Sequence, residues 1–357
     1  MEKYQKYGIN PFLISIATGQ DATNVPLRPT VAMLPGKYPR HIYKYIKEIN
    51  SLFPENIFRL TCKSCDKSGD YDLGTMVLSP ITDQSKGMPN QFQAVGYFRC
   101  KHCNTAGEWE LSQRMQTVLA GKMATAPSED ADSKENSGVV FGQALIDGEF
   151  APRWGSDAET YFLNMLCKNP KDSYLWNRLG NIYYKGKRPD LAACAYEQAI
   201  LVDMGQVESH FSLGQMLLDC DELEAAAEHL RQAVAFAHQY NSLSALDLRE
   251  LIVGALIVLL AIYNQSNMKI DMLPSPKELA IASFTKSEIA ATAKFDFDID
   301  PHRRETLYPL AEVYLGARRD ELSAEDRTIH IPRPKAAWPV SNKVNKQKSS
   351  KKSKKRK

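Results

Sequence analysis

The sequence predicts an α+β protein of several domains, in which a small β-rich domain precedes an α-helical array and a basic tail. Three observations predict this organisation. Two Cys-x-x-Cys pairs lie within residues 56–112, a stretch rich in aromatic and branched residues. Helical apolar spacing then runs almost without interruption from Asp157 to about Ala317. The last segment, 329–357, contains no acidic residue and eleven Lys or Arg.

Length and charge agree with this division. The chain has 357 residues, which is enough for two or three domains of ordinary size. Its net charge is only +3, but the basic tail carries eleven positive charges, so residues 1–328 carry a net charge of −8. An acidic body therefore precedes a disordered basic tail that cannot form a core of its own.

Residues 1–55 are a mixed N-terminal segment. Residues 24–41 are rich in proline and favour an extended or looping chain, whereas residues 41–53 have apolar side chains at helical spacing. The apolar run at 12–17 is too short for a signal peptide.

The longest apolar run, 251–263, is shorter than the roughly 18–20 residues that cross a bilayer, and it predicts a buried helix. The three cysteines outside the pairs are scattered singly, unlike those of a secreted disulfide framework. We therefore expect a soluble, cytoplasmic protein without a membrane partner.

The two cysteine pairs are the strongest chemical signal in the sequence. They are Cys62 with Cys65 and Cys100 with Cys103, and each has a two-residue spacer. Such a spacer lets a tight turn present both sulfurs to one ion, and two such turns complete a tetrahedral zinc site. Four thiols leave no coordination position for water, so we expect one structural Zn²⁺ per chain. The alternatives are two separate redox pairs, or His102 replacing one cysteine.

The arrangement of these pairs at the ends of predicted strands resembles the zinc-ribbon class over residues 56–112. That resemblance implies a small β-rich zinc-ribbon-like domain in which the metal is structural. Residues 113–138 are predicted to form a short helix at 113–122 and then a polar linker. The segment 139–328 is predicted as the helical domain, with a non-helical start at 139–152.

The helical domain contains an internal repeat of thirty-four residues. The first copy has Trp176, Leu179, Gly180, Tyr183, Ala192, Tyr196 and Ala199. The second copy keeps the character of six of these positions at Leu213, Gly214, Leu217, Ala226, Leu230 and Ala233. This spacing resembles the tetratricopeptide repeat, abbreviated TPR, with full repeats at about 173–206 and 207–240. A generic helical bundle is the alternative.

The resemblance implies a TPR-like solenoid that binds a protein or peptide on its concave, first-helix face. The candidate partner-binding residues on that face are Tyr174, Asn177, Asn181, Tyr184, Phe211 and Gln215. Asn181 matches an asparagine with which related domains hold a peptide carboxylate. The lysine that such domains place four residues earlier is Asn177 here, so recognition of a carboxylate end is not implied.

The basic tail suggests contact with nucleic acid. Its densest cluster consists of Lys351, Lys352, Lys354, Lys355, Arg356 and Lys357. No aromatic residue follows Trp338, so any contact should be to phosphates and indifferent to sequence. The alternative is a solvated end that keeps an acidic body soluble.

Taken together, these features predict a zinc-binding adaptor or scaffold that binds a protein partner through TPR-like helices. One alternative is a nucleic-acid-associated factor that uses the zinc ribbon and the basic tail. Another is an enzyme with its site in the N-terminal segment. We expect no enzymatic activity, because the sequence shows no phosphate-binding loop and no nucleophile–base arrangement.

Overall fold

The computed structural model describes residues 8–49, 55–79, 92–125, 138–292, 299–300 and 303–329. Within these ranges two three-stranded sheets precede a run of helices, which confirms the α+β class. Residues 330–357, which make up all but the first residue of the basic tail and include its six proposed nucleic-acid contacts, lie outside the described residues.

Two small sheets form the β-rich part. The first has the order β2–β1–β5 and is antiparallel, with β1 at Ile57–Cys62, β2 at Ser68–Asp72 and β5 at Trp109–Leu111. The second has the order β4–β3–β6, with β3 at Met76–Leu78, β4 at Phe92–Ala94 and β6 at Val139–Phe141. Strand β6 runs parallel to β3, pairing Met76 with Val139.

This pairing corrects the predicted domain boundary at residue 139. Val139 and Trp154 are buried in the same core as β1 and β3, so the β-rich domain extends to the start of the next helix. Helix α4 (Gln113–Thr125) also belongs to it, since Met115 and Leu119 are buried in that core. Helix α4 covers the short helix predicted at 113–122, but the sequence grouped that helix with the linker and grouped residues 139–152 with the helical domain, because the spacing within each segment does not show which core it joins.

Five helices follow with a regular spacing. They are α5 (Gly155–Lys168), α6 (Ser173–Lys185), α7 (Pro189–Val202), α8 (Val207–Asp219) and α9 (Leu223–Phe236). The bounds of α8 and α9 follow those of α6 and α7 by thirty-four residues, and α7 follows α5 by the same number. Local signals set the starts: Asp172 accepts a hydrogen bond from the Leu175 amide, and Pro189 occupies the first position of α7.

The C-terminal helices close the far end of this array. They are α10 (Ala245–Gln265), α11 (Pro276–Ile281), α12 (Lys286–Thr292) and α13 (Tyr308–Leu315). Short 3₁₀ helices occur at Ala22–Asn24, Val31–Met33, Ala237–Gln239, Arg304–Leu307 and Gly316–Glu321. The predicted buried helix at 251–263 is confirmed as part of α10.

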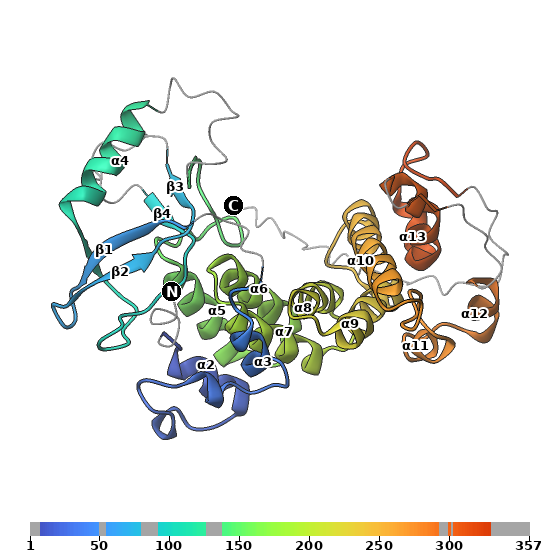
Figure 1. The fold of residues 1–357 in the computed structure, drawn as a ribbon, viewed down its shortest axis with the longest axis horizontal. Helices are drawn as coiled ribbons and strands as arrows, with labels where there is room; N and C mark the ends of the chain where they lie inside the picture. The colour runs from blue at the N-terminus through green and yellow to red at the C-terminus, as the bar shows by residue number, and fades with distance from the viewer. Residues whose placement is uncertain are drawn as a thin grey trace, which may run out of the picture.

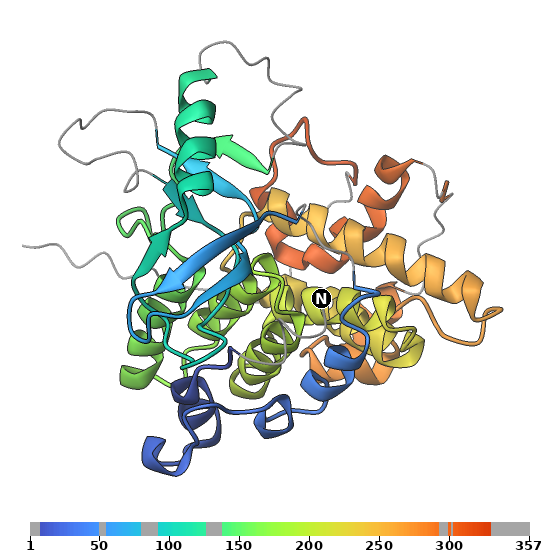
Figure 2. The ribbon, with the colours of Figure 1, turned by 60° about the vertical axis from the view of Figure 1, so that its left-hand side comes forward.

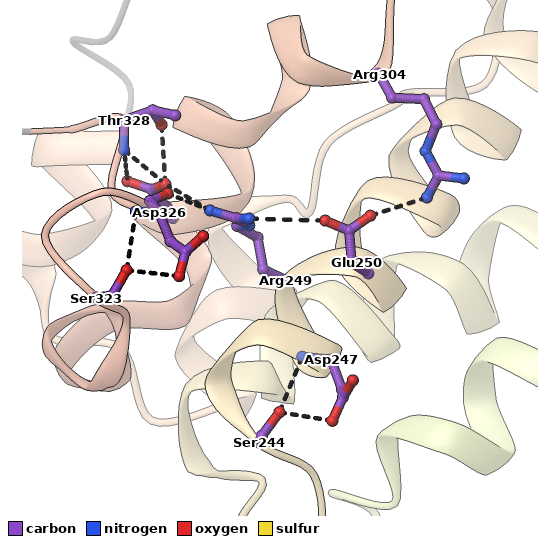
Figure 3. A network of polar contacts seen from close by, with 9 residues as sticks. Ser244, Asp247, Arg249, Glu250, Arg304, Ser323, Asp326 and Thr328 are labelled. Carbon is purple, nitrogen blue, oxygen red and sulfur yellow. Dashed lines mark hydrogen bonds and ion pairs between the residues drawn. The ribbon is translucent and has the colours of Figure 1, made fainter.

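A polar network ties α10 to the end of the described chain (Figure 3). The buried Glu312 of α13 accepts hydrogen bonds from the Thr328 and Ile329 amides, at 2.9 and 2.8 Å. Arg249 of α10 donates to the Asp326 carbonyl and pairs with Glu312. Residues 323–329 are therefore fixed against α10 and α13. Within the part of the chain that the structure describes, each helix is too short or too polar to traverse a bilayer.

The N-terminal segment packs on the helical array. Its helices are α2 (Pro11–Thr18) and α3 (Pro39–Lys44), and the helix predicted at 41–53 therefore starts two residues earlier and ends sooner. Residues 50–53 of that prediction lie outside the described residues. Figure 1 shows α2 and α3 beside α5 and α7, with the sheets at one end of the molecule and α10–α13 at the other. Figure 2 shows the same arrangement from a second side.

Candidate metal centre and helix-face surface

Two short turns bring the four cysteines together. We call residues 62–67 the first knuckle and residues 100–105 the second knuckle. In each, the amide four residues after the first cysteine donates to that cysteine's carbonyl at 2.8 Å. The residue after the second cysteine, Asp66 or Asn104, has a positive φ of 55° or 62°, which Asp and Asn tolerate better than most residues.

A second backbone bond repeats as well. The Cys62 amide donates to the Lys67 carbonyl at 3.0 Å, and the Cys100 amide donates to the Thr105 carbonyl at 2.9 Å. The two knuckles thus have one backbone conformation, although they lie on different strands and share little sequence besides the cysteines. This equivalence is typical of a two-turn metal site.

The sulfur positions fit a tetrahedral ion. All four Sγ atoms lie within 4.8 Å of one another, and the pairs Cys62–Cys103 and Cys65–Cys100 are separated by 3.7 and 3.6 Å. A tetrahedron of sulfurs about 2.3 Å from a central zinc has edges of about 3.8 Å. The four predicted ligands are therefore brought together at metal-binding distances. Among the described residues, these four cysteines form the one group of side chains close enough together to bind a metal ion. His102 is not part of that group.

Hydrogen-bond donors surround three of the four sulfurs and favour ionisation of Cys103. The Thr105 hydroxyl lies 2.9 Å from Cys103 Sγ and 3.5 Å from Cys62 Sγ, and the His102 amide donates to Cys100 Sγ at 3.4 Å. Burial opposes ionisation of Cys103, but hydrogen bonds from Thr105 and the nearby thiols bring its pKa down to about 6. At Cys65 a hydrogen bond with the Lys67 backbone acts in the same direction, but burial and hydrogen bonds with the other three thiols raise its pKa to about 12. Four thiolates at such distances repel one another, so a cation is needed to hold all four.

Thr105 and Asn104 are site residues that sequence reasoning missed. Both directly follow the second cysteine pair, so their position was available as a signal. The contacts themselves depend on the turn geometry, which a linear pattern does not specify. A hydroxyl beside a thiolate typically orients and stabilises a metal ligand, as outer hydrogen bonds do at metal sites.

The candidate partner-binding residues differ in accessibility. Tyr174 and Gln215 are exposed, with Tyr174 40% exposed, while Asn181, Tyr184 and Phe211 are half-buried. Asn177 has 0% exposure, and its side chain accepts a hydrogen bond from Ser209 at 2.9 Å. The prediction that Asn177 contacts a partner is therefore at odds with its position between α6 and α8. The helical spacing could not show that α8 covers it.

Asn181 also has a role within the helix pair. Its Oδ1 accepts a hydrogen bond from the Tyr196 hydroxyl of α7 at 2.7 Å, which leaves its amide nitrogen for other contacts. Phe211 lies against Gly254 of α10, where an added Cβ would come within 3.3 Å of the ring. Asn181 and Phe211 therefore each contact a neighbouring helix as well as lying at the surface.

One stripe of α6 carries the accessible side chains. Tyr174, Arg178, Asn181 and Lys185 recur at intervals of three and four residues, so they share one face of the helix. The equivalent stripe of α8, thirty-four residues later, is Glu208, Ser212, Gln215 and Asp219. The α6 stripe is therefore cationic and aromatic, whereas the α8 stripe is acidic and polar.

The chain was compared with known proteins. No protein-family model matches it, and a search of curated proteins found no match.

Proposed function

We propose that this protein is a zinc-binding adaptor that holds a segment of a partner protein on the first-helix face of a TPR-like array. The zinc-ribbon-like domain supplies a rigid, metal-stabilised end to that array. The metal is structural, because four thiols complete its coordination. Zinc is favoured over harder cations by the purely sulfur ligand set.

The observation that carries this proposal is an asymmetry between the two faces of the array. The second helices, α5 and α7, are contacted by the N-terminal segment of the same chain. For example, Glu197 of α7 accepts hydrogen bonds from the Lys37 and Tyr38 amides, at 2.8 and 3.1 Å. The first helices of the two pairs are α6 and α8, and the side chains of the two stripes described above stay at least partly exposed on them.

The chemistry of that face suits a polar protein segment. Tyr174 and Arg178 lie together, with the guanidinium 5.9 Å from the ring centroid, and offer stacking and hydrogen bonding. Gln215 on α8 adds a donor and an acceptor on the neighbouring stripe. Helix-pair arrays commonly bind extended segments or helices on such a surface.

A comparison of captured proteins tests this proposal. The wild type, a triple variant Tyr174→Ala/Asn181→Ala/Gln215→Arg, and a control Gln113→Ala/Arg114→Ala on α4 are each used to purify partners after nuclease treatment, at high salt. We expect one or more proteins that the wild type and the control retain and the triple variant loses. If the wild type and both variants retain the same proteins, the first-helix face is not the binding surface.

A further inference from the structure

A buried carboxylate joins three separate parts of the chain. Glu159 of α5 has 0% exposure and accepts hydrogen bonds from Asn10 at 2.9 Å, the Tyr97 hydroxyl at 2.8 Å and the Tyr183 hydroxyl at 2.7 Å. Arg99 adds an ion pair at 3.0 Å. The donors come from the N-terminal segment, from the β-rich domain and from α6. Removing one partner of such a buried charge is costly, so this junction holds the three parts together.

The second knuckle forms the other half of this junction. Arg99, next to Cys100, donates from Nε to the carbonyl of Asn104 at 2.9 Å. The side-chain Nδ2 of Asn104 donates in turn to the Ile9 and Leu27 carbonyls, at 2.9 and 2.7 Å. Arg28 donates to the Lys101 carbonyl at 2.7 Å. The N-terminal segment is thus attached to the same six-residue turn that supplies two of the four thiols.

From this attachment the N-terminal segment continues across the second helices. Gly36 sits against Glu197, where an added Cβ would lie 2.3 Å from the carboxylate. Tyr38 packs edge-on against His229 of α9, with ring centroids 5.5 Å apart, and His41 contacts Glu222 at the start of α9 at 3.0 Å. One segment therefore contacts α5, α7 and α9 in turn.

We propose that metal binding at the four cysteines holds the N-terminal segment on the helical array. The conformation of the second knuckle depends on Cys100 and Cys103 sharing an ion with the first knuckle. When the ion is absent, the Asn104 side chain and the Lys101 carbonyl lose their fixed positions, and the segment loses its attachment near Ile9 and Leu27. Binding of the metal and docking of the segment are then thermodynamically coupled, and each strengthens the other.

Hydrogen exchange measured by mass spectrometry on the full chain tests this coupling. The wild type is compared as purified and after zinc is removed with a chelator. We expect peptides within 8–49 to lose protection together with residues 99–105, while α8 and α9 keep theirs. Unchanged protection of 8–49 in metal-free protein whose α8 and α9 remain folded would overturn the proposal.

A variant that keeps its metal separates this coupling from general unfolding. Asn104→Asp keeps a side chain that tolerates the positive φ but replaces the amide donor with an acceptor. With two hydrogen bonds lost, we expect zinc to transfer to a competing chelator about tenfold faster, and residues 8–28 to exchange faster while zinc is still bound. The control is Lys63→Ala on the first knuckle, whose amine pairs with Glu108 at 3.2 Å. Equal transfer rates for both variants and the wild type would refute the coupling.

Discussion

Gly180 of α6 lies directly against the ring of Tyr196 of α7. A Cβ built on Gly180 would come 2.4 Å from Cε1 and 2.6 Å from Cδ1 of that ring, closer than real contacts allow. Thirty-four residues later, Gly214 of α8 stands in the same relation to Leu230 of α9, at 2.8 Å. The absence of a side chain therefore sets the distance between the two helices of each pair.

We predict that Gly180→Ala destabilises the helical domain although alanine favours helices. The methyl group would push Tyr196 from a buried position where its hydroxyl bonds Asn181, and overpacking typically costs about 1–3 kcal/mol. Gly180→Leu should cost more. Urea denaturation, monitored by circular dichroism, measures the free energy of unfolding.

Gly121 of α4 provides the matched control. An added Cβ there would meet nothing within 4 Å, so Gly121→Ala should stabilise by up to about 1 kcal/mol through helix propensity alone. If Gly180→Ala raises the stability as Gly121→Ala does, then α6 and α7 leave room for a side chain at Gly180 and do not approach as closely as described.

A buried histidine pair predicts sensitivity to acid. His210 and His229 face each other with Nδ1 atoms 2.9 Å apart. Burial lowers the pKa of His210 to about 4, and burial with the nearby His210 and Lys37 lowers the pKa of His229 to about 3. The unfolded chain binds these protons near pH 6.5 and the folded chain does not, so the free energy of unfolding falls as pH drops from about 6.5 to about 4.

Each histidine should contribute up to about 1.4 kcal/mol per pH unit to this slope. We therefore expect His229→Gln to lose stability less steeply than the wild type between pH 7.5 and pH 5. Urea denaturation at several pH values measures both slopes. Parallel slopes would mean that His229 is protonated in the folded protein.

The basic tail makes a separate prediction about nucleic acid. Deleting residues 341–357 should leave the fold and the metal content unchanged and remove most RNA or DNA binding at low salt. Lysine–phosphate contacts release counterions, so the binding of the full chain should weaken steeply as salt increases. Gel-shift titrations of both forms at two salt concentrations measure this. Equally tight binding by the truncated form would place the contact elsewhere and favour the nucleic-acid alternative.

Local patterns predicted much of the site and of the helical fold. The two-residue spacers of the cysteine pairs were sufficient to predict that the four cysteines lie together, because each pair sits in a short turn whose hydrogen bonds close within six residues. Apolar spacing likewise located α6 through α10, since a helix needs only its own sequence to orient its buried face. Asp172 and Pro189 start their helices as such residues usually do.

Features that depend on distant contacts were not predictable in this way. Strand β6 is three residues long and pairs with β3 some sixty residues earlier, so no alternation marks it. Glu159 is a charged residue in a helix, which the sequence alone would place at the surface, yet three other segments bury it. The N-terminal segment gave no sign of which face it would cover, because its contacts are single side chains and carbonyls spread over forty residues.

The most direct measurement is the metal content of the purified protein. Elemental analysis of the full chain, purified without added metal, should find one zinc per chain. Cys100→Ser should lose the zinc, because three thiols no longer complete the tetrahedron, while Cys167→Ser, at an exposed position outside the cluster, should keep it. A wild-type protein that is fully folded and contains no zinc would contradict the account.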